Sequence, residues 1–190
     1  QFPVAEELIK LSQTASLINQ QANKKSIDTV FFKVGIKQRK WQQIQDFEHC
    51  LPWSHLPLME WCSGKGYLAQ LYSLKHKQKV ECVEFNHQLC VDGKQHAKKF
   101  KCDAHFLHKN VLTENTDDCF SNNKIAVALH ACGQLHLNLI EQTIKHKTPY
   151  LAFAPCCYHL TDDCHQPLSD IALSTGLIFT TDEMRLALEQ

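Results

Sequence analysis

The chain has 190 residues, which fits one ordinary domain better than two, and its hydrophobic content of 44% is enough for a core. Twenty basic residues balance twenty acidic ones, so no global attraction to nucleic acid follows. The apolar runs are too short to cross a bilayer, and ten cysteines without a signal peptide favour free thiols in a reducing cytoplasm. Because the chain begins at Gln1 and stops inside a helix-like segment, we expect a piece of a longer protein, truncated at its C-terminus.

The first fifty residues carry helical patterns. Apolar residues recur at helical spacing over residues 4–21, and a second helix is predicted around residues 41–47. Prolines at positions 52 and 57 then interrupt the chain. We therefore expect an N-terminal helical extension over residues 1–50 and a second unit over residues 51–190.

From residue 58 onward, short apolar runs alternate with segments of helical spacing. The predicted strands cover residues 58–61, 79–84, 102–109, 124–129 and 150–154, with a candidate sixth at 176–181. The predicted helices between and after them cover residues 67–74, 88–99, 135–145 and 168–175. This alternation predicts an α/β fold: a Rossmann-like, doubly wound, mostly parallel sheet with helices on both faces.

The turn after the first predicted strand contains the most informative residues. Glu60 ends an apolar run, and Gly64 and Gly66 follow in a turn that leads into a helix. Glycines at this place let a ligand approach the backbone, and Glu84, which closes the second strand, is placed to accept hydrogen bonds from ribose hydroxyls. The segment thus predicts a nucleoside-containing cofactor.

Two cofactors fit this turn. Residues 64–69 satisfy the glycine fingerprint of dinucleotide binding, which would make the chain an NAD-dependent oxidoreductase. However, Glu60 would repel a pyrophosphate, whereas it attracts the ammonium and sulfonium groups of S-adenosylmethionine. The carboxylate therefore favours S-adenosylmethionine. The alternative is a turn that binds no cofactor, with Glu60 exposed to solvent.

The same turn resembles motif I of class I methyltransferases, with Cys62 in place of the first glycine. At the end of the third strand, Asn110 is placed to meet the adenine and Val111 lies beside the ring, although a plain asparagine turn explains Asn110 equally well. The cofactor-binding set predicted in this way is Glu60, Cys62, Gly64, Gly66, Glu84, Asn110, Val111 and His130.

Two later motifs narrow the resemblance. His-Ala-Cys-Gly follows the fourth strand at residues 130–133, and Cys-Cys-Tyr-His follows the fifth at residues 156–159. With the motif I turn before them, they resemble the methyltransferase family that includes the tRNA acceptor-stem 2′-O-methyltransferase and its uncharacterised relatives. The resemblance implies methyl transfer from S-adenosylmethionine, and it favours RNA, such as tRNA or rRNA, as the acceptor.

The acceptor side is predicted to lie between these two motifs. His130 occupies the position that lines the reactive methyl group in class I methyltransferases. The alternative is that His130 only caps a helix or packs in the core. His130 and His159 are the candidate bases, and Cys156, Cys157, Tyr158 and His159 form the predicted substrate-binding wall. The alternative to an enzyme is a domain that binds the cofactor or RNA without catalytic activity.

Two further patterns receive a plainer interpretation. The cysteines and histidines of residues 156–165 lack the spacing of a zinc knuckle, and adjacent cysteines chelate one ion poorly, so no metal is expected. The basic run 33–40 lies near Phe31, Phe32 and Trp41 and would suit RNA by charge and stacking. A solvated helix start with core aromatics is the favoured interpretation of that run.

Overall fold

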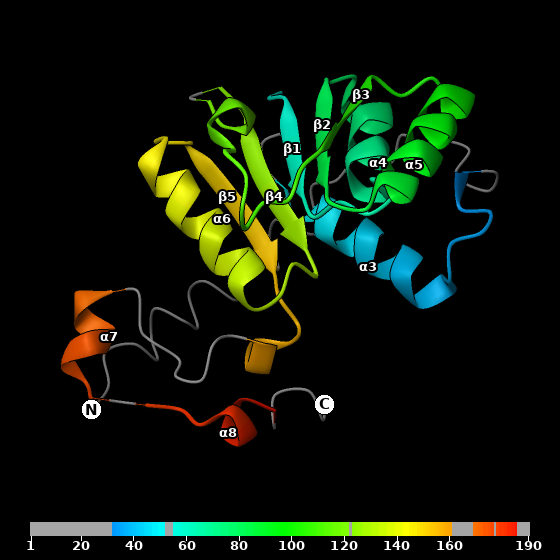
Figure 1. Ribbon diagram of the computed structural model, residues 1–190. Helices are drawn as coiled ribbons and strands as arrows, with labels where there is room; N and C mark the ends of the chain where they lie inside the picture. The colour runs from blue at the N-terminus through cyan, green and yellow to red at the C-terminus, as the bar shows by residue number, and fades with distance from the viewer. Residues whose placement is uncertain (1–31, 52–54, 122, 161–168, 177, 186–190) are drawn as a thin grey trace.

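A computed structural model describes residues 32–51, 55–121, 123–160, 169–176 and 178–185. Its centre is one sheet of five parallel strands in the order β3-β2-β1-β4-β5 (Figure 1). The strands are β1 (Leu58–Trp61), β2 (Val80–Glu84), β3 (Ala104–His108), β4 (Ile125–Leu129) and β5 (Tyr150–Ala154). The predicted parallel sheet is confirmed, and its strand order reverses between β1 and β4, where open α/β sheets bind ligands.

Helices cover both faces of the sheet (Figure 1). One face carries α3 (Gln38–His49), α4 (Tyr67–His76) and α5 (His87–Phe100), whereas α6 (Gln134–Lys145) lies on the other. Strand β1 serves both layers, because Leu58 packs into the first core while Met59 and Trp61 pack into the second. All four β1 residues are buried, including Glu60, as expected for a strand of a parallel sheet that is covered on both faces.

Helix α3 belongs to the same core as the sheet. Its Trp41 and Ile44 are buried with Leu68 of α4. Near its C-terminal end, the buried Glu48 forms an ion pair with Lys75 and a hydrogen bond of 2.6 Å with His76, both on α4. Helix α3 is therefore packed against the sheet layer, and the boundary suggested at residue 50 stays a prediction.

The C-terminal part differs from the prediction. The expected sixth strand at 176–181 is wrong for its described residues: residues 178–180 form no strand, and α8 (Thr181–Arg185) begins at position 181. The cause is a capping box, in which Glu183 accepts a hydrogen bond from the backbone of Thr180 and the Thr180 hydroxyl accepts one from the Glu183 N–H. Helix α7 (Asp170–Ser174) confirms a shorter form of the expected helix.

Some expectations fall outside the described residues, among them the helix predicted at 4–21. In the part that the structure describes, no helix combines the length and the apolar character needed to span a membrane.

Candidate active site

The turn after β1 has an unusual backbone. Cys62, Gly64 and Gly66 adopt positive φ angles of 55°, 58° and 67°. A left-handed conformation costs a residue with a side chain roughly 1–2 kcal/mol, which explains why glycine suits the position of Cys62 in motif I. Burial raises the pKa of the Cys62 thiol to about 12, so this side chain is neutral at pH 7.

The two glycines of the turn have different neighbours. A Cβ atom added to Gly64 would meet no atom within 4 Å, so this backbone faces open space. A Cβ atom on Gly66 would lie 2.7 Å from the Cys82 sulfur and 2.9 Å from the Phe106 ring. Gly64 thus leaves room for a ligand, whereas Gly66 lets α4 approach β2 and β3. From the sequence, both glycines were predicted to let the ligand approach the backbone.

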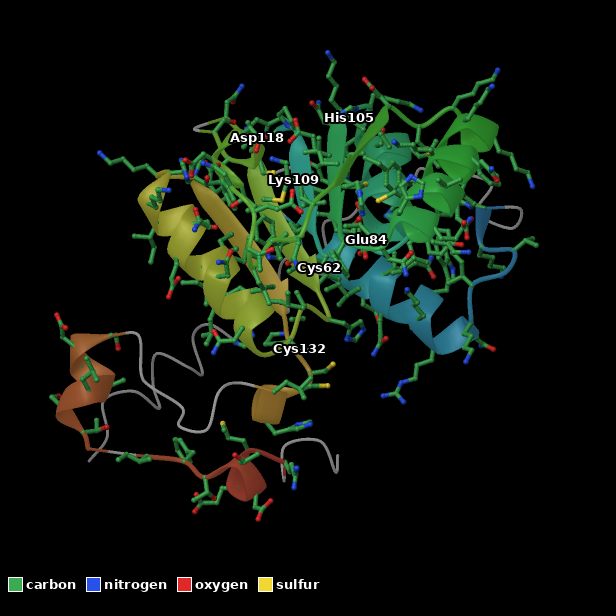
Figure 2. The ribbon with its side chains drawn as sticks, viewed as in Figure 1. Cys62, Glu84, His105, Lys109, Asp118 and Cys132 are labelled. Carbon is green, nitrogen blue, oxygen red and sulfur yellow. The ribbon has the colours of Figure 1, made fainter. Side chains whose placement is uncertain are left out.

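Glu84 connects the turns after β1 and β2. One carboxylate oxygen accepts a hydrogen bond of 2.8 Å from the Gly64 N–H, and the other accepts one of 2.8 Å from the Asn86 N–H. The side chain therefore holds the motif I turn in place as well as facing the cavity described next. Figure 2 shows Glu84 and Cys62 together near the lower edge of the sheet, where the strands end.

A cavity of about 470 Å³ opens beyond β2 and β3. Its volume falls within the range of small-molecule sites. It has an apolar wall with few polar groups and is lined by Cys62, Val83, Glu84, Phe85, Lys109, Asn110, Val111, Leu112 and Leu135. The Asn110 side-chain oxygen accepts a hydrogen bond from the Leu112 N–H, so Asn110 forms the plain turn and also lines the cavity.

A second cavity, of about 150 Å³, lies on the other side of Cys62 and shares that residue with the first. Its wall combines a carboxylate with a cation and is formed by Lys40, Ile44, Glu60, Cys62, Ser63, Gly64, Tyr67, Leu68, Leu129 and His130. Gly66 lines neither of these two cavities.

Glu60 is the buried carboxyl group of the smaller cavity, with an exposed fraction of 5%. Burial raises the pKa of Glu60 to about 8, although a hydrogen bond from the Ala69 N–H and the charge of Lys40 act in the opposite direction. The group is therefore largely protonated at pH 7 in the free protein. A ligand cation in this cavity would favour its ionised form.

His130 follows β4 with a φ angle of 68° and borders the smaller cavity. Its Nε2 lies 3.1 Å from the side-chain oxygen of Gln43, and its Nδ1 lies 3.3 Å from the Cys156 sulfur. An amide oxygen only accepts hydrogen bonds, so Nε2 carries the proton and Nδ1 keeps its lone pair. Burial and the charges of Lys40 and Arg39 lower the pKa of His130, which favours its neutral form.

The structure brings three cysteines together beside His130. The sulfurs of Cys132, Cys156 and Cys157 all lie within 4.8 Å of one another. Burial alone would raise the pKa of the Cys132 thiol, but hydrogen bonds from the Cys156 and Cys157 N–H groups help to bring it below its ordinary value. Burial and the two neighbouring sulfurs raise the pKa of Cys156 to about 12.

The other predicted wall residues are less informative. His159 lies in the short helix η2 (Tyr158–Leu160) and lines neither cavity, and its Nδ1 is buried with no hydrogen-bond partner among the described residues. The side chain of Tyr158 lies outside the described part. The predicted wall thus remains a prediction, apart from the position of its two cysteines beside His130.

Sequence reasoning missed the contribution of α3 to the site. Lys40 lines the smaller cavity and Gln43 holds His130, although both precede motif I. The basic run 33–40 could have pointed to Lys40 as a site residue, but from the sequence this run was interpreted as a helix start exposed to solvent. That interpretation is confirmed for the aromatic neighbours Phe32 and Trp41, which are buried in the core, whereas Phe31 lies outside the described residues.

Solved structures of similar fold include methyltransferases. The Pyrococcus abyssi tRNA (uracil-54, C5)-methyltransferase in complex with S-adenosyl-L-homocysteine shares 15% identity over 62% of this chain and 28% of that one, with a TM-score of 0.49. The ribosomal protein L11 methylase from Lactobacillus delbrueckii subsp. bulgaricus shares 16% identity over 62% and 60%, with a TM-score of 0.49. YjhP from E. coli shares 13% over 75% and 58%, with a TM-score of 0.48.

This chain spans less than two thirds of the length of each of these three proteins. A comparison with curated proteins gives no match. The sequence profile of the methyltransferase domain matches residues 39–164, which include α3 except Gln38, the residues that line both cavities, and the cysteine cluster. The profile covers well over half of the chain and decides against the NAD-dependent oxidoreductase. The chain therefore belongs to the methyltransferase-domain family.

Proposed function

We propose that the protein binds S-adenosylmethionine across the two cavities, with the adenosine in the larger one and the methionine end in the smaller one. The observation that carries this proposal is that the cavities meet at Cys62 and that each contains a carboxyl group, Glu84 in one and Glu60 in the other. The cofactor supplies a methyl group made electrophilic by a sulfonium.

The residues of the smaller cavity fit the charges of an amino-acid group. Glu60 faces the ammonium and ionises against it, and Lys40 faces the carboxylate. The apolar wall of the larger cavity, including Val83 and Val111, packs against the base, while Glu84 accepts from the ribose. The work of these residues is to bind the cofactor and to orient it.

We propose RNA as the acceptor. Lys37, Arg39 and Lys40 are exposed at the start of α3, and the charges of Arg39 and Lys40 act on His130 at the edge of the smaller cavity. A cationic rim beside the acceptor side suits an anionic backbone. The family resemblance of motifs 130–133 and 156–159 points to the same class of substrate.

His130 and His159 receive different roles. Both ring nitrogens of His130 are engaged, so we assign it the wall that positions the acceptor. His159 follows the cysteine loop after β5, and we propose it as the group that accepts the acceptor's proton, although it lines neither cavity and its Nδ1 is buried. His159→Ala is expected to lower kcat while S-adenosylhomocysteine binds within a few-fold of the wild-type affinity.

The experiment is a methyl-transfer assay with radiolabelled S-adenosylmethionine and bulk tRNA as the probe. The double variant Lys37→Glu/Arg39→Glu should bind tRNA more weakly and reduce the slope of log affinity against log salt by about 1 per lost phosphate contact. Lys98→Glu/Lys99→Glu, which reverses two exposed charges on α5, is the matched control.

The outcomes separate the candidate functions. Label transferred to tRNA supports the proposal, and equal loss of tRNA affinity in both double variants would show that the α3 rim has no special role. Cofactor binding without label on tRNA, rRNA or protein would favour a binding domain without catalytic activity.

A further inference from the structure

The carboxyl ends of β4 and β5 bring together a cluster of soft ligand atoms from two loops. Cys132 follows β4, and Cys156 and Cys157 follow β5, which pairs with β4 in the sheet. The sulfur of Cys156 lies 3.3 Å from that of Cys132 and 3.5 Å from that of Cys157. Thiolates bound to one tetrahedral zinc ion, with Zn–S bonds of about 2.3 Å, stand roughly 3.8 Å apart, so these sulfurs are already near the required spacing.

We propose that Cys132, Cys156, Cys157 and the Nδ1 atom of His130 bind one zinc ion. The sequence-based prediction of no metal rested only on the cysteines and histidines of residues 156–165. The fold supplies Cys132 and His130 from the preceding loop. The three sulfurs lie within 4.8 Å of one another, and the His130 Nδ1 lies next to this group, 3.3 Å from the Cys156 sulfur. A set of three cysteines and one histidine is a common closed zinc site. Binding of the ion displaces the three thiol protons to solvent.

The backbone around Cys132 supports a metal-bound thiolate. The N–H groups of Cys156 and Cys157 both donate to the Cys132 sulfur, at 3.2 Å each. Two N–H donors on one sulfur favour its anionic form. They also point the loop after β5 toward Cys132, so the ligands are grouped before the ion binds.

His130 lies beside the three sulfurs and supplies the fourth ligand after a shift of its ring toward the ion. Gln43 accepts the Nε2–H of its ring, which leaves the Nδ1 lone pair 3.3 Å from the Cys156 sulfur. A metal-binding histidine usually donates its second ring N–H to a fixed acceptor, and loss of that acceptor weakens metal affinity about 10–100-fold. The His130 backbone N–H also donates to the Ala154 carbonyl, which ties the two ligand loops together.

The ion would stabilise the loops that border the cofactor cavity. His130 belongs both to the ligand set and to the wall of the smaller cavity, so metal binding fixes this wall. The metal site does not depend on the acceptor or on methyl transfer, and its test therefore measures metal directly.

The test uses the full chain, stripped of metal under reducing conditions and then exposed to zinc and separated from free ion. Elemental analysis should find one zinc per chain in the wild type and in Cys50→Ser, which removes an exposed thiol elsewhere. Cys132→Ser and Cys157→Ser should lose the ion. With cobalt in place of zinc, the wild type should show thiolate charge-transfer absorption and the visible bands of tetrahedral coordination.

A further variant keeps the test independent of folding defects in the cysteine variants. Gln43→Ala leaves all four ligands in place and should weaken zinc affinity about 10–100-fold. Zinc binding equal in the wild type and Cys132→Ser would overturn the proposal. So would mass spectrometry showing a Cys132–Cys156 disulfide in place of metal binding, because the cluster would then be a redox pair.

Discussion

The two glycines of the motif I turn allow a sharp test, because alanine at each has a different structural cost. Both have positive φ, so each alanine costs roughly 1–2 kcal/mol of backbone strain. Gly64→Ala adds no clash, since no atom lies within 4 Å of the new methyl group. Gly66→Ala places its methyl group 2.7 Å from the Cys82 sulfur and 2.9 Å from Phe106, which adds about 1–3 kcal/mol of overpacking.

The free energy of unfolding should therefore fall by about 1–3 kcal/mol more in Gly66→Ala than in Gly64→Ala. The loss of conformational entropy in the unfolded chain is the same for both alanines and cancels in this difference. Urea unfolding monitored by circular dichroism measures the difference, and a slope of about 1–3 kcal/mol/M converts it into a midpoint shift of about 1 M.

Ligand binding should show the opposite order. The Gly64→Ala methyl group enters the space that we assign to the cofactor and should weaken S-adenosylhomocysteine binding at least tenfold, or about 1.4 kcal/mol. Gly66→Ala, measured well below its melting temperature, should bind within a few-fold of the wild type. Equal stability of the two variants, or normal binding by Gly64→Ala, would refute the division of roles between these glycines.

Two other carboxyl groups give predictions of their own. Glu84→Gln should weaken S-adenosylmethionine binding by about 1–3 kcal/mol in titration calorimetry, while Glu141→Gln on the exposed surface of α6 should leave it unchanged. For Glu60, the folded pKa of about 8 exceeds the ordinary value of 4.5, so this group makes the free protein less stable as pH rises from about 4.5 to 8. Glu60→Gln should remove that part of the slope in urea unfolding at several pH values. Cofactor binding at pH 7 should release a proton in the wild type but not in Glu60→Gln, and calorimetry that finds equal release in both would contradict the pairing with the ammonium.

The residues predictable from the sequence are those whose role depends on chain neighbours. Glu60 lies one residue before the end of β1 and Glu84 ends β2. In a parallel sheet these ends meet at one edge, so the place of both residues follows from local patterns. Asn110 and Val111 reach their cavity for the same reason. The family's motifs then identified His130.

The missed features depend on contacts between distant segments. Nothing in the local pattern of Cys132 shows that its sulfur accepts hydrogen bonds from Cys156, 24 residues later. Gln43 meets His130 across 87 positions. The sixth strand was wrongly predicted because apolar and β-branched residues at 177–181 resemble a strand, whereas the capping box that begins α8 depends on Glu183.

The two ends of α3 meet different parts of the molecule. Its last turn is fixed by the ion pair and the hydrogen bond of Glu48 with α4, and its first turns bring Lys40 and Gln43 to the cavity wall and to His130. A helix that precedes motif I thus supplies both a wall of the pocket and the support of a residue on the far loop. A polypeptide that began at residue 51 would retain the glycine turn and both cysteine motifs and still lack the α3 wall of the smaller cavity. We therefore expect the smallest unit that binds the cofactor to begin before α3.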